Sequence, residues 1–242
     1  MRQKKHRQKN YRNFNGVIRK VKPILFTTYM VRSILDGRKT VTRRVIKRQP
    51  IDSEYCKHEL QTFHEMLPEI YSDDYSAACK KCGYGVCPSG ESIYKPPCVP
   101  GDILYVRETW CYGRIECGEE PDGRDALYIT QRDGENDVVF KEYAKRNDIG
   151  TDDVKWKPSI FMPKEAARIF LRVTNVRVER LQDIMDDPPG PNNQVVREGC
   201  KYGCDFIALW DRTIKETDKP LYGWDANPWV WVIEFERTSE FK

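Results

Sequence analysis

An alternating segment in the second half of the chain constrains the fold most. Between Arg168 and Glu179, the side chains of Ile169, Leu171 and Val173 fall on the opposite side from those of Arg168, Phe170 and Arg172. Successive side chains of a strand point to opposite faces, so this period of two predicts a long strand over residues 168–179. The segment is typical of a β-rich core domain.

Shorter patterns complete a mixed α and β prediction. Further strands are expected at residues 24–26, 40–46, 103–107, 127–129 and 229–235. One helix is expected after Thr27 or Thr28, ending at Gly37, and a second from Phe206 to Ile214. Three prolines between Pro188 and Pro191 exclude a helix there.

Composition indicates a folded chain without an export or membrane signal. The 242 residues are 39% hydrophobic and 12% aromatic, which is enough for a sizeable core in one domain with insertions. No run of 18 apolar residues occurs, and the amino terminus lacks the apolar centre of a signal peptide. We therefore expect a cytoplasmic protein with no membrane partner.

Basic residues are concentrated at the amino-terminal end. Residues 1–50 contain 16 Lys and Arg against the single acid Asp36, a net charge of +15, whereas residues 51–242 carry −11. Such a density of cations attracts polyanions, so RNA is the first partner to consider. A membrane surface or a solubilising tail would show the same composition. Residues 1–21 are predicted to form a basic arm that is disordered until it binds.

The turn after Gly37 is the first candidate for chemistry. It reads Gly37-Arg38-Lys39-Thr40-Val41-Thr42-Arg43-Arg44, with a helix predicted before it and a strand after it. Alternation sends Thr40, Thr42 and Arg44 to one face, and Val41, Arg43 and Val45 to the other. The simplest interpretation is a basic strand edge that faces water.

Three ordered motifs carry a resemblance to a known family. They are Leu35-Asp36-Gly37-Arg38-Lys39-Thr40-Val41-Thr42-Arg43-Arg44, Pro100-Gly101-Asp102-Ile103-Leu104-Tyr105-Val106-Arg107-Glu108-Thr109-Trp110 and Tyr222-Gly223-Trp224-Asp225-Ala226-Asn227-Pro228-Trp229-Val230-Trp231-Val232-Ile233-Glu234-Phe235. Together they resemble the ASCH family, named for activating-signal-cointegrator homology, in the long-insert form of bacterial and phage genomes. The resemblance implies an α+β, PUA-like β-barrel with a few short helices, built from residues 22–50 and 100–242. It also implies a nucleic-acid or nucleoside cleft beside the Gly37-Arg38-Lys39-Thr40 turn.

The resemblance also implies a candidate catalytic set. Small bacterial ASCH proteins include amidohydrolases that remove the acetyl group from acetylated cytidine, and their essential positions look like Lys39, Thr42 and Glu198. A desolvated lysine can take a proton from a threonine hydroxyl, and a carboxylate can orient the lysine. The proline-rich segment before Glu198 departs from the family, which has a short helix there. Other candidates for ligand contact are Arg38, Thr40, Arg44, Trp110 and Trp224.

Three functions stay open on the sequence. The first is binding of RNA or a modified nucleoside in the cleft, with the basic arm on phosphates. The second is an amidohydrolase that acts on acetylated cytidine or a related nucleoside through Lys39, Thr42 and Glu198. The third is a protein-interaction scaffold.

A cysteine-rich insertion, residues 51–99, lies outside the resemblance. Cys79 and Cys82 have the spacing that places two thiolates at adjacent corners of a tetrahedral zinc site. Cys87 is the candidate third ligand, and Cys56, His58 or Cys98 the fourth. A structural zinc knuckle would order this core-poor segment. The alternative is a loop with free thiols, because an odd cysteine count without an export signal argues against a disulfide framework. No organic cofactor is indicated.

Overall fold

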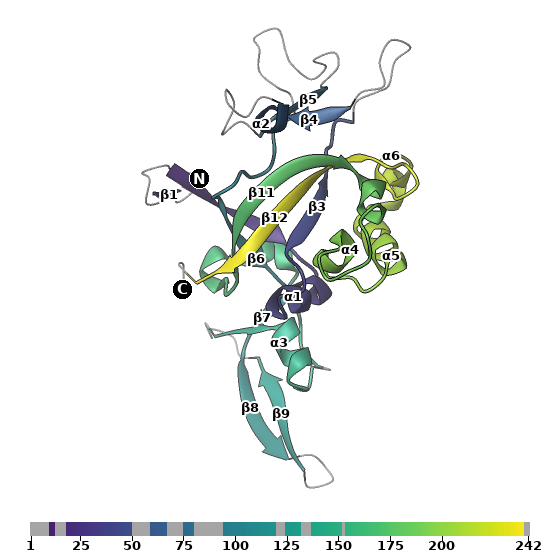
Figure 1. Ribbon diagram of the computed structural model, residues 1–242. Coiled ribbons are helices and arrows are strands. Elements are labelled where there is room, and N and C mark those ends of the chain that lie inside the picture. The colour runs from purple at the N-terminus through teal and green to yellow at the C-terminus, as the bar shows by residue number, and fades with distance from the viewer. Residues whose placement is uncertain are drawn as a thin grey trace. The chain divides into compact units, whose positions relative to one another are not determined.

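The computed structural model describes residues 10–12, 18–49, 59–66, 75–79, 94–119, 124–131, 137–151 and 153–239 (Figure 1). The chain divides into two compact units. Unit 1 comprises Met1–Gly37, Ile103–Leu171 and Arg237–Lys242, and unit 2 comprises Arg38–Asp102 and Arg172–Glu236. Helices and strands occur in both units, which confirms the predicted α+β class.

The sheet strands of unit 1 are ordered β1-β2-β6. Strand β1 (Asn10–Arg12) pairs antiparallel with β2 (Ile18–Leu25), and β2 pairs parallel with β6 (Ile103–Arg107). The buried apolar side chains around them are Val21, Ile103, Tyr105 and Phe170. Residues 10–12 and 18–21 were predicted to belong to a disordered arm. They are strands here, since backbone pairing along β2 satisfies main-chain groups without needing many apolar side chains.

The other elements of unit 1 are short. They are α1 (Thr28–Leu35), β7 (Trp110–Tyr112), β8 (Arg114–Glu119), β9 (Asp125–Thr130), β10 (Val138–Phe140), α3 (Lys141–Arg146) and two 3-10 turns (Ser159–Phe161 and Lys164–Ala166). Thr27 caps α1 as predicted, and its hydroxyl accepts a hydrogen bond from the Met30 N–H at 3.4 Å. Strands β8 and β9 form an antiparallel hairpin, and β7 pairs with β10.

Unit 2 contains the strand order β11-β12-β3. Strand β11 (Phe170–Arg180) begins in unit 1, and β12 (Trp229–Thr238) pairs antiparallel with β3 (Val41–Val45). Helices α4 (Gln194–Arg197) and α5 (Gly203–Thr213) lie beside these strands (Figure 1). The strands and helices of unit 2 share one buried apolar cluster. Its members are Val41, Leu181, Ile184, Val195, Cys200, Phe206, Trp210, Val230 and Val232.

The remaining elements of unit 2 are small. They are β4 (Leu60–Thr62), α2 (Phe63–Met66), β5 (Ala77–Cys79), two 3-10 helices (Leu181–Met185 and Glu216–Asp218) and α6 (Lys219–Tyr222). Among the described residues, the strands do not close into a barrel, and no helix is long and apolar enough to span a membrane.

Candidate functional site

The predicted turn begins where α1 ends. Gly37 has a φ of 75°, a left-handed conformation that glycine adopts without a side-chain penalty. The next segment of unit 2 is then fixed to its neighbours by backbone pairs. The Thr40 N–H donates to the Arg197 carbonyl at 2.8 Å, and the Phe235 N–H donates to the Thr40 carbonyl at 2.9 Å. The turn residues are therefore held between α4 and β12.

Lys39 and Glu198 form a buried ion pair inside unit 2. The Lys39 ammonium donates to the Glu198 carboxylate through Oε2, to the Glu198 carbonyl at 3.0 Å and to the Val41 carbonyl at 2.8 Å. Lys39 is 2% exposed and Glu198 is 3% exposed. Two residues separated by 159 positions, and predicted to act together, thus come into direct contact.

Burial changes the proton affinity of this lysine. Removal of the Lys39 ammonium from water lowers its pKa below the usual value, and the Glu198 carboxylate, which favours the charged form, offsets only part of that effect. A lysine in such a setting loses its proton more readily than one at the surface. This is the property that a general base needs.

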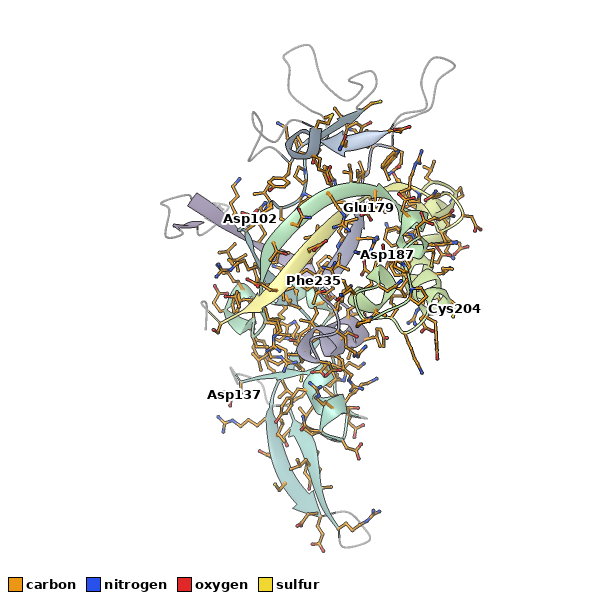
Figure 2. The ribbon with its side chains drawn as sticks, in the orientation of Figure 1. Asp102, Asp137, Glu179, Asp187, Cys204 and Phe235 are labelled. Atoms are coloured by element: carbon orange, nitrogen blue, oxygen red, sulfur yellow. The ribbon has the colours of Figure 1, made fainter. Side chains whose placement is uncertain are left out.

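Arg43 holds the other side of the same carboxylate. Its guanidinium donates to Glu198 Oε1 at 3.2 Å, to Glu179 Oε2 at 3.1 Å and to Gln194 Oε1 at 3.4 Å. Glu179 lies on β11, where Figure 2 labels it. Because each Glu198 oxygen accepts from a different cation, the carboxylate is fixed in position and orientation.

Arg43 was not among the predicted site residues. The alternation of β3 had placed it on the same face as Val41, which belongs to the apolar cluster. A charged residue on a buried strand face needs partners, and this mismatch is the signal that could have identified it.

Arg197 and Glu234 continue this polar network. The Arg197 guanidinium donates to the Thr40 hydroxyl at 3.2 Å and to Glu234 at 2.8 Å, while Arg177 donates to both Glu179 and Glu234. The network therefore connects the turn with α4, β11 and β12. Thr40, predicted to contact a ligand, has its hydroxyl engaged within it.

Thr42 and Arg44 contact each other. An Arg44 NH group donates to the Thr42 hydroxyl at 3.0 Å and to the Arg43 carbonyl at 3.1 Å. Thr42 is 1% exposed, and Arg44 is half-buried. Arg38 is exposed, and one of its NH groups donates to the Gly199 carbonyl at 3.1 Å. Arg38 is thus the more accessible of the two predicted arginines, whereas burial lowers the pKa of the Arg44 guanidinium below its usual value.

The two tryptophans predicted beside a cleft both pack against other side chains. Trp110, in unit 1, is buried and meets Tyr112 edge-on at a ring distance of 4.8 Å. Trp224, in unit 2, is half-buried against the apolar cluster and meets Phe206 edge-on at 6.2 Å. Packing accounts for the position of both rings, and the buried indole N–H of Trp110 has no hydrogen-bond partner within the described part of the chain.

The zinc prediction falls largely outside the described residues. Cys79 is buried on β5, where it pairs with Leu60, but Cys56, Cys82 and Cys87 lie in segments that the structure does not describe. Within the described ranges, no group of three His, Cys, Asp or Glu side chains is arranged to hold a metal ion. The knuckle stays a prediction.

A surface hollow of about 420 Å³ lies elsewhere in unit 2. Its lining residues are Glu216, Lys219, Pro220, Asp225 and Ala226. This hollow is open to solvent. The buried lysine with a lowered pKa, which could act in catalysis, lies instead in the Lys39 cluster. We therefore place the candidate site at Lys39 and Glu198.

Comparison of the chain with protein-family models, with curated proteins and with solved structures gives no match. The case for a site consequently rests on the geometry of unit 2.

Proposed function

We propose that unit 2 binds a modified nucleoside, free or within RNA, at the Lys39–Glu198 centre. The observation that carries this proposal is the buried contact between the Lys39 ammonium and the Glu198 carboxylate. The ASCH resemblance implies a functional pairing of these two positions. On this proposal the chain is an ASCH-type protein, and its α+β architecture is an elaborated form of the PUA-like fold.

The side chains around the centre suit a nucleoside. The Glu198 carboxylate can accept hydrogen bonds from an exocyclic amine, and a lysine ammonium can donate to a carbonyl oxygen of a base. Arg38 and Arg44 carry guanidinium groups that pair well with a phosphate. Because Lys39 and Thr42 are nearly inaccessible, a ligand would enter by displacing Arg44 from the Thr42 hydroxyl.

Amide hydrolysis is the second candidate, favoured by the lowered pKa of Lys39. The neutral Lys39 amine would take the Thr42 hydroxyl proton while the Thr42 oxygen attacks the acyl carbon. The carbon–nitrogen bond then breaks, and the nucleoside amine leaves with the proton from Lys39. Water hydrolyses the acyl-threonine ester, releasing the carboxylic acid and restoring the hydroxyl. In this scheme Glu198 orients Lys39, and Arg43 positions Glu198.

A turnover assay tests both candidates. The purified 242-residue protein is incubated with acetylated cytidine and related acyl nucleosides, beside Lys39→Ala and the surface control Lys219→Ala. Equilibrium dialysis measures binding. The proposed site is supported if the parent and Lys219→Ala bind the nucleoside and a folded Lys39→Ala variant does not. Release of free cytidine would support amide hydrolysis as well. If the parent protein neither binds nor hydrolyses any of these nucleosides, that result would contradict the proposal for this class of ligand.

A further inference from the structure

Unit 1 carries a second chemical feature, on the loop before β11. Phe161 is 70% exposed, more than any other large apolar side chain among the described residues, and its neighbour Ile160 is 56% exposed. Exposed single apolar residues are common, but two adjacent ones this accessible on a fixed loop need an explanation.

The backbone of this loop is fixed by several contacts. The Phe161 N–H donates to the Pro158 carbonyl at 3.0 Å, and Arg107 donates through its guanidinium to the Ile160 carbonyl at 3.1 Å. Met162 is fully buried, and its sulfur accepts from the Glu108 N–H at 3.3 Å. Prolines 158 and 163 precede the two 3-10 turns and restrict the chain further. The fold therefore holds Phe161 outward.

Two lysines of this loop, and Arg107 of β6, each lie beside an aromatic ring. The Lys157 ammonium lies 4.3 Å from the ring centre of Tyr112, and the Lys164 ammonium lies 6.0 Å from that of Tyr105. The Arg107 guanidinium lies 5.6 Å from the Tyr105 ring. Residues 154–164 contain three lysines and no acid. Contact with the rings restricts the lysines without neutralising their charge.

We propose that this loop is a binding platform for single-stranded nucleic acid. One base stacks on the exposed face of Phe161, and Lys157 and Lys164 contact the neighbouring phosphates. The combination of an exposed aromatic ring and a basic track is the pattern by which proteins bind single strands without reading their sequence.

Charge distribution favours a polyanion over a protein partner. Lysines are depleted at protein–protein interfaces, whereas phosphate contacts require them. Unit 1 as a whole contains 23 Lys and Arg against 16 Asp and Glu, with the excess of cations in residues 1–37. The platform belongs to unit 1 and the Lys39 centre to unit 2, so this inference goes beyond the proposed function.

The test is fluorescence anisotropy of a labelled uridine dodecamer with the full chain. Phe161→Ala should raise Kd roughly tenfold, because the base no longer stacks on the ring. The dependence of Kd on salt should not change, because all phosphate contacts are kept. Lys157→Ala should weaken binding and lower the slope of log K against log salt by about 0.7. Leu221→Ala, which removes a side chain 62% exposed in unit 2, is the matched control and should leave Kd unchanged.

Two outcomes would overturn the platform. One is a Phe161→Ala variant that binds the dodecamer as tightly as Leu221→Ala. The other is a Phe161→Ala variant that loses affinity for phosphatidylserine vesicles but not for the dodecamer, which would identify a membrane surface as the partner. The platform and the Lys39 centre are tested separately. If both proposals hold, Phe161→Ala should bind the dodecamer more weakly but bind acetylated cytidine as the parent does.

Discussion

At the scale of single residues, Glu198 joins two buried cations in unit 2. Its two carboxylate oxygens accept from Lys39 and Arg43, both of which are buried. A buried ion pair gains little net stability over an apolar replacement, but removal of one partner leaves the other charge unpaired. Two cations depend on this carboxylate.

Glu198→Gln should therefore lower the free energy of unfolding by about 3–5 kcal/mol, measured by urea denaturation. Glu216→Gln is the matched control, because the Glu216–Lys219 pair lies at the surface, and it should leave the urea midpoint nearly unchanged. Equal midpoints for the two variants would show that the Glu198 contacts are not formed in solution.

Cys200 gives a test of burial at the same centre. Burial, followed by the negative charge of Glu198, raises the pKa of the Cys200 thiol to about 11. At pH 8.5 only about 0.3% of such a thiol is the reactive thiolate. Cys204, in the next helix, is exposed. Peptide mass spectrometry after iodoacetamide treatment should show Cys204 alkylated long before Cys200.

The same shift has a consequence for stability. The pKa of Cys200 in the folded state lies above the unfolded value of about 8.5. Its contribution to the free energy of unfolding is therefore complete below pH 8.5 and is lost as pH rises toward 11. Cys200→Ala should flatten the fall in stability over this window. Alkylation of both cysteines at one rate at pH 8.5 would contradict a buried Cys200.

At the scale of elements, the end of α1 depends on a glycine. Gly37 has a left-handed φ, and a Cβ added there would meet nothing within 4 Å. Gly37→Ala therefore tests backbone strain alone, and it should cost about 1–2 kcal/mol of unfolding free energy. At Gly150, whose φ is not left-handed, a Cβ would meet the Leu127 carbonyl at an ordinary 3.6 Å, so Gly150→Ala is the control. A loss no larger for Gly37→Ala than for Gly150→Ala in thermal unfolding would refute the assigned conformation.

The elements also show how far the sequence can predict this fold. The strand at residues 103–107 and the capped helix after Thr27 follow from alternation and a capping hydroxyl, both local signals. Strand β8 was missed because its pattern is weak and it contains a glycine. The structure explains that glycine, since a Cβ at Gly118 would lie 0.9 Å from the Tyr128 hydroxyl of β9. A requirement set by the partner strand is not visible in the local sequence.

The candidate site divides in the same way. Lys39, Thr42 and Glu198 were predicted through a family resemblance, and the structure pairs Lys39 with Glu198. The Arg43 contacts with Glu179 and Gln194 join residues 136 and 151 positions apart. Periodicity within β3 could place Arg43 on a buried face, but it could not identify partners on other elements.

At the scale of the whole molecule, charge is divided between the amino-terminal end and the rest of the chain. Residues 1–9 carry five Lys and Arg and no acid, and they precede β1. If they contact phosphates, deletion of residues 1–9 should lower the salt slope of RNA binding by about 0.7 per lost contact. The deletion stops before Asn10 so that the pairing of β1 with β2 is kept. An unchanged slope would exclude a phosphate-binding role for this segment.

The central claim is that a nucleoside binds at Lys39 and Glu198. We would test it by nitrogen-15 NMR of the lysine side chains during titration with acetylated cytidine, with the Lys39 signal assigned through Lys39→Arg. The proposal predicts a saturable shift of the Lys39 signal while Lys219, at the surface, does not change. Saturable binding with an unmoved Lys39 signal, or no binding at all, would contradict it.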